Sequence, residues 1–163
     1  MSVSSVQLPT ERALQKFLQD SGDINPTYRI LCAHDMEALP REGNFVAITT
    51  GPGNSEELID NATSRVEFRV ATQVADADIR AEKTAELQAI VGAIQNLFCW
   101  QNFDDALPAL NAQQTEAGGI TIGVSGWEEI GAPMDTQTDA QIISTLPYDF
   151  DVFISDAESE SES

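Results

Sequence analysis

A strict alternation of apolar and polar side chains marks the clearest element of the chain, the segment Ser64–Val74. One set of alternate positions holds Val66, Phe68, Val70, Thr72 and Val74, and the other holds Arg65, Glu67, Arg69 and Gln73. A period of two residues is that of a β-strand, in which successive side chains point to opposite faces. We therefore expect a strand with one buried face and one face toward solvent or a neighbouring molecule.

The next segment, Ala75–Phe98, changes to a helical period. Its apolar residues form one stripe, made of Leu87, Ile90, Val91, Ile94, Leu97 and Phe98. This spacing predicts the main core helix. A shorter amphipathic helix is predicted over Leu8–Gln19, and we expect it to stop at Ser21 and Gly22.

Several other segments combine β-favouring residues with flanking turn residues. They predict strands at Thr27–Ala33, Asn44–Thr50, Ile120–Val124, Trp127–Gly131, Ala140–Thr145 and Tyr148–Ile154. Phe103–Ala112 predicts one or two further helical turns. These elements indicate the α+β class, with a mixed or antiparallel β-sheet packed against one long and one or two short helices. We expect residues 1–154 to form a single domain.

The end of the chain, Ser155–Ser163, differs from the rest in composition. It contains four acidic residues and no apolar residue beyond Ala157. Such a segment buries too little apolar surface to offset the entropy of ordering. We predict that residues 155–163 form a disordered acidic tail.

Acidic residues dominate the chain well beyond this tail. The 27 Asp and Glu against 8 Lys and Arg give a net charge of −19, and no Lys or Arg follows Lys83. Binding to DNA or to an anionic membrane relies on clustered Lys and Arg. The charge therefore disfavours a specific nucleic-acid reader and a membrane-surface protein. The uncharged stretch Leu87–Asn102 is also shorter than the ~20 apolar residues of a transmembrane helix, and the N-terminal residues lack the pattern of a secretory signal.

Candidate catalytic or metal-ligating residues are few. The segment Gly51–Gly53 lacks the Lys of a phosphate-binding P-loop, so we expect a turn. His34 lies beside Asp35 and near Glu37, but a His without a second His or Cys ligand is usually structural.

The thiols and hydroxyls give no catalytic pattern either. Cys32 and Cys99 are not spaced as a metal or redox motif, and we expect buried free thiols. No serine lies in a Gly-x-Ser-x-Gly context. We therefore expect a protein that is not an enzyme and that uses no cofactor and no metal.

Three regions are candidates for contact surfaces. The loop Gly51–Thr63 is long for a connection inside a compact domain, so we expect it to project toward a neighbouring subunit. Its candidate assembly residues are Gly51, Pro52, Gly53, Asn54, Glu56 and Glu57. Trp100 and Trp127 fit either an interface or buried packing. Asp149 and Asp151 share one face of the last strand, either as DNA-repelling acids or as its solvated side.

The order of these elements resembles the phage tail terminator proteins. The resemblance spans residues 8–154 and includes the strand SRVEFRVATQV, the helix around KTAELQAIVGAIQNLF, and the β-rich segments GITIGVSGWEEIGAP and YDFDVFIS. It implies a small α+β subunit that assembles into a hexameric ring at the end of the tail tube. The implied partners are other copies of the chain, the tail tube protein and the head–tail connector of the neck.

The resemblance also implies a location and a role for the acidity. The protein would be assembled in the host cytoplasm and reside in the tail or neck of the virion, with genomic DNA passing through the ring. An acidic wall would repel the duplex and let it slide. Two alternatives remain, which are another neck or head-completion protein and an acidic DNA-mimic binding protein. A mimic would carry its acids in DNA-like spacing on an outer face, whereas a ring would line its hole.

Overall fold

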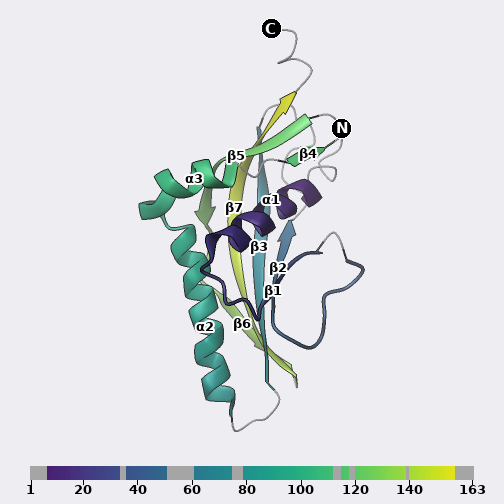
Figure 1. Ribbon diagram of the computed structural model, residues 1–163, viewed down its shortest axis with the longest axis vertical. Coiled ribbons are helices and arrows are strands. Elements are labelled where there is room, and N and C mark those ends of the chain that lie inside the picture. The colour runs from purple at the N-terminus through teal and green to yellow at the C-terminus, as the bar shows by residue number, and fades with distance from the viewer. Residues whose placement is uncertain are drawn as a thin grey trace.

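Three α-helices and a seven-stranded sheet make up the computed structural model, which describes residues 7–33, 36–50, 61–74, 79–111, 115–117, 120–138 and 140–156 (Figure 1). The helices are α1 (Gln7–Ser21), α2 (Arg80–Leu97) and α3 (Phe103–Asn111), with a 3₁₀ turn, η4 (Trp100–Asn102), before α3. The strands are β1 (Arg29–Cys32), β2 (Phe45–Thr50), β3 (Asn61–Gln73), β4 (Thr115–Ala117), β5 (Ile120–Glu129), β6 (Met134–Gln137) and β7 (Gln141–Asp156). The predicted α+β class with a mixed sheet is confirmed.

The two longest strands, β3 and β7, form the centre of the sheet. Their antiparallel ladder runs from the pair Asn61 and Phe153 to the pair Gln73 and Gln141. The strand order is β1-β2-β3-β7-β5-β4, with β6 pairing with the first part of β7, and only β1 and β2 are parallel. In Figure 1 the ladder of β3 and β7 extends along the long axis of the molecule. The other strands extend the sheet on either side of this ladder.

The predicted division of the last strand at residues 146–147 is wrong, because β7 is continuous through Pro147. The carbonyl of Pro147 accepts a hydrogen bond from the Ile130 N–H at 3.2 Å. The nitrogen and carbonyl of one strand residue face the same side, so the missing N–H of Pro147 faces the β5–β6 connection and not β3. The proline therefore removes no hydrogen bond from the central ladder.

Three other boundaries differ from the sequence prediction. The predicted loop Gly51–Thr63 is wrong at its end, because residues 61–63 already pair with β7. The predicted tail is wrong at its start, because Ser155 and Asp156 pair with β5. The 127–131 strand is the second half of β5, and β4 and β6 were not predicted. In each case pairing with a neighbouring strand decides the conformation, which a local pattern does not contain.

A single large core lies between the helices and one face of the sheet. Leu14, Phe17 and Leu18 of α1 pack there with the predicted stripe of α2 and with the inward residues of β2, β3 and β7. The predicted inward set of β3 is confirmed, since its members are at most 4% exposed. Helix α1 ends as predicted near Gly22, whose positive φ of 72° suits a helix C-terminus.

Among the described residues, an apolar cluster covers the opposite face of the sheet at one end only. A small cluster of Leu31, Phe45, Ala47 and Ala71 packs beneath Met36 and Leu39 of the connection between β1 and β2. From Arg65 to Arg69 on β3 and from Thr145 to Asp151 on β7, the outward residues are polar or charged apart from Pro147. We call this surface the open face and define it by Arg65, Glu67, Arg69, Glu128, Pro147, Asp149 and Asp151.

Side chains cap two of the sheet edges. The Arg29 N–H bonds to Asn44, so the backbone groups of the next residue, Ile30, face outward, and the Gln15 amide donates to the Ile30 carbonyl at 2.7 Å. On β5, the Asn111 side chain of α3 accepts from the Val124 N–H and donates to its carbonyl, both at 2.8 Å. Capped edges offer fewer free groups for pairing with another chain.

Candidate functional site

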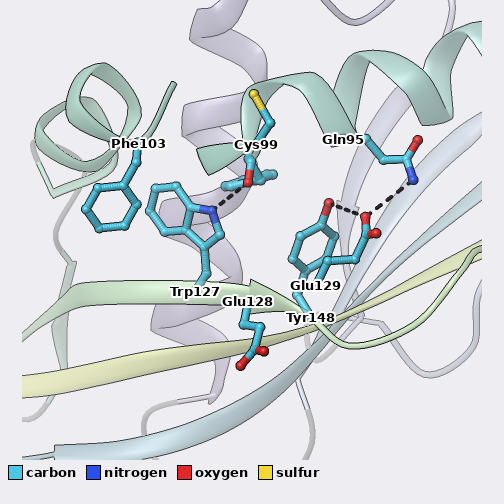
Figure 2. A pocket seen from close by; sticks show the side chains of 8 residues that line it. Gln95, Cys99, Phe103, Trp127, Glu128, Glu129 and Tyr148 are labelled. Atoms are coloured by element: carbon cyan, nitrogen blue, oxygen red, sulfur yellow. Dashed lines mark hydrogen bonds between the residues drawn. The ribbon is translucent and has the colours of Figure 1, made fainter. Parts of the chain in front are cut away.

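A hollow on the helix-covered side lies between the end of α2, the start of α3 and β5. We call it the Trp127 pocket (Figure 2). Its volume is about 470 Å³, and its lining residues are Gln95, Phe98, Cys99, Phe103, Trp127, Glu128, Glu129 and Tyr148. Aromatic rings form most of its wall, and the Glu129 carboxylate lies at its rim.

Trp127 is held in place by a backbone hydrogen bond and by rings on two sides. Its indole N–H donates to the Phe98 carbonyl at 2.8 Å. The Phe98 ring meets the indole edge-on at 5.4 Å between centroids, and the Phe103 ring lies at 4.9 Å. Such contacts add to the energy of apolar burial. Trp127 is thus half-buried, with its polar atom already satisfied inside the chain.

A carboxylate joins β5 to β7 and α2 on the other side of the pocket. The Tyr148 hydroxyl donates to Glu129 Oε2 at 3.2 Å, and the Gln95 amide donates to the same oxygen at 3.3 Å (Figure 2). Burial, and then the charge of Glu129, raises the pKa of Tyr148. The Tyr148 hydroxyl is therefore a hydrogen-bond donor near neutral pH and not a base.

The pocket also contains one thiol. Half-buried Cys99 lines it, but no His and no second thiol accompany it among the described lining residues. In the described ranges no three His, Cys, Asp or Glu side chains group as metal ligands. No helix in those ranges is long and apolar enough to cross a bilayer. The pocket is an aromatic hollow with a half-buried thiol in its wall and the Glu129 carboxylate at its rim.

The open face carries both signs of charge in neighbouring rows. Arg65 of β3 donates to Asp149 of β7 at 2.9 Å, and the two residues are direct cross-strand partners. Glu128 pairs with Asp149 from the other side, and Figure 2 shows its side chain on the opposite side of β5 from Trp127. The predicted outward orientation of Asp149 and Asp151 agrees with their exposure, since their neighbours Tyr148, Phe150 and Val152 are buried.

The structure thus places the predicted site residues in two separate regions. Trp127 lies in its pocket, and Asp149 and Asp151 lie on the open face. The loop candidates Gly51, Pro52, Gly53, Asn54, Glu56 and Glu57 lie outside the described residues, as do His34 and Asp35. The predicted burial of free thiols holds for Cys32 at 3% exposed, whereas Cys99 is half-buried.

Sequence reasoning missed the partners of these residues. The Arg65–Asp149 pair joins positions 84 residues apart, and the Tyr148–Glu129 bond depends on where β5 ends. The only available signal was the alternation of β3 and β7, which places Arg65 and Asp149 on outward faces. It does not supply the register that brings them together.

Comparison with known proteins does not assign a family. No family model matches the chain, and no curated protein matches its sequence. One solved structure aligns over 88% of this chain and 91% of its own, with 17% identity and a TM-score of 0.41. A likeness at that level carries no argument about function.

Proposed function

We propose that this chain is a structural virion protein of a tailed phage. Its copies would form a ring that terminates the tail tube and joins it to the head connector, with DNA passing through the lumen. In this role the protein acts by assembly in the tail or neck of the virion, after folding in the host cytoplasm, and needs no catalytic group.

The open face is the observation that carries the proposal. The helices pack on one side of the sheet, whereas on the other side Arg65, Arg69 and Asp151 are exposed, and Glu67 and Asp149 are partly exposed. A ring requires two different surfaces on each subunit that meet by rotation. The open face and the Trp127 pocket lie on opposite sides of the sheet, so one subunit can contact two neighbours at once.

The charge pattern supports a ring over a DNA mimic. On the open face Arg65 and Arg69 alternate with Glu67, and Arg65 neutralises Asp149. A mimic of the duplex presents acids in phosphate-like rows, and interleaved arginines would break such rows. Mixed charges suit contact between protein subunits, where complementary charges set register and orientation.

The test measures assembly of the purified protein with its expected partner. We expect the mass of the protein to rise to that of a closed ring when tail tubes are added. A phage genome that lacks the gene should produce tail tubes of abnormal length that are not joined to heads. An Asp149→Arg variant, which repels Arg65, should melt close to wild type yet assemble poorly. Normal tail length and head joining without the gene would reject the proposal.

A further inference from the structure

A second hollow lies on the side of the sheet away from the helices, at the end where β7 begins and beside the small cluster of Phe45 and Leu39. Its volume is about 550 Å³, and it is lined by Leu39, Pro40, Arg41, Glu42, Phe45, Arg69, Thr138, Ala140, Gln141 and Ile143. We call it the arginine hollow. Its floor is apolar, with Phe45 at 2% exposed, and its exposed polar rim includes two guanidinium groups and the Glu42 carboxylate.

The two arginines of this hollow are unusual in so acidic a chain. Among the described residues neither Arg41 nor Arg69 has a hydrogen bond or an ion pair, although Arg65 and Lys83 each have a carboxylate partner. The chain carries 27 acidic residues against 8 basic ones. Two cations that have no partner among the described residues, over an apolar floor, form a site for an extended acidic segment, because a guanidinium binds a carboxylate through paired hydrogen bonds.

We infer that the arginine hollow binds the acidic segment Ala157–Glu162 of a second copy of this chain. That segment places Glu158, Glu160 and Glu162 at alternate positions. In an extended strand alternate side chains point the same way, with a repeat of about 7 Å. The three carboxylates can therefore face the arginines together, and the small Ala and Ser residues between them make no clash with the apolar floor.

The geometry of β7 decides that the contact is between copies. The hollow includes Gln141, the first residue of β7, whereas the acidic segment follows Asp156, the last. Fifteen steps of a strand span about 50 Å. The six residues from Asp156 to Glu162 reach at most about 21 Å. A chain therefore does not reach its own hollow, and Figure 1 shows β7 running away from that end.

Such a contact joins the arginine hollow of one copy to the acidic segment of another. The acidic segment of the first copy and the hollow of the second remain free for further copies. It is therefore a head-to-tail contact, which continues into a closed ring or an open row of subunits. It also explains why Arg41 and Arg69 lie together in one hollow of a chain whose copies otherwise repel one another. The inference stands apart from the phage role proposed above, since it concerns copies of this chain alone.

The experiment measures the mass of full-length variants by sedimentation at low salt over a range of protein concentration. We expect the unaltered chain to associate, and R41E/R69E to weaken that association about tenfold or more. E158Q/E160Q/E162Q should do the same from the other side of the contact. The matched control is K16E/R29E, which makes the same charge change at exposed residues outside the hollow. It should leave association through the arginine hollow intact.

Mixing separates contact between copies from any effect within one chain. R41E/R69E keeps an intact acidic segment, and E158Q/E160Q/E162Q keeps an intact hollow, so the mixture should form heterodimers although each variant alone is monomeric. R41Q/R69Q repeats the test without adding negative charge. An unaltered chain that stays monomeric, a mixture that stays monomeric, or association of R41E/R69E equal to that of the K16E/R29E control would overturn the inference.

Discussion

Tyr28 and Tyr148, the two tyrosines of the chain, are both buried, and burial raises the pKa of each. Tyr28 shares a hydrogen bond of 2.6 Å with the Thr72 hydroxyl, and Tyr148 donates to Glu129. We expect ultraviolet titration of the folded protein to show tyrosinate only well above pH 10, whereas the protein unfolded in denaturant should titrate near the ordinary value of about 10.

The sign of the effect on stability follows from the same shift. Below the pKa of the unfolded tyrosines, these side chains are protonated in both the folded and the unfolded protein. The stability that the buried, protonated tyrosines contribute is then fully present. As pH rises from about 10 through the folded pKa the unfolded state loses protons first, and stability falls. Tyr148→Phe should reduce that fall more than Tyr28→Phe does. Tyrosinate formation near pH 10 in the folded protein would contradict the prediction.

Helix α3 caps the edge of β5 in addition to packing against it. Its last residue, Asn111, bonds both backbone groups of Val124 and so acts as a short substitute for a strand. Asn111→Ala should lower the free energy of unfolding by about 1–3 kcal/mol, because it leaves a partly buried donor and acceptor without partners. It should also raise aggregation, since the freed β5 edge is open to other chains.

Asn111→Asp is the matched comparison for this edge cap. Aspartate keeps the oxygen that accepts from the Val124 N–H but replaces the amide that donates to the Val124 carbonyl. We expect chemical denaturation to place it between the wild type and Asn111→Ala. Equal stability of all three proteins would show that the cap contributes nothing.

The elements that the sequence predicted well are those whose burial shows in their own residues. The stripe Leu87 to Ile94 and the alternation about Phe68 identified α2 and β3 because each has one apolar face. Strand β6 has four exposed residues, so no apolar pattern marks it, and only pairing with β7 makes it a strand. The two hollows need the register of several elements at once, and a linear pattern does not supply that register.

At the scale of the whole molecule, the net charge of −19 must oppose folding through repulsion among acids. Salt shortens the Debye length from about 10 Å at 0.1 M to about 3 Å at 1 M. We therefore expect the melting temperature to rise with salt, whereas association through the arginine hollow should weaken, because salt also screens attraction. E158Q/E160Q/E162Q should melt almost as the wild type does. A melting temperature that falls with salt would mean that ion pairs such as Arg65–Asp149 outweigh the repulsion.

The place of β7 at the centre of the sheet also sets when the protein is able to fold. A ribosome makes β7 after every other described element, yet β3, β5 and β6 all pair with it. Until then one edge of β3 has no strand to pair with, and the long-range ladder of β3 with β7 does not form. The nascent chain is therefore an unfinished sheet until β7 is made, and we expect its excess of negative charge to keep such chains apart on a crowded polysome.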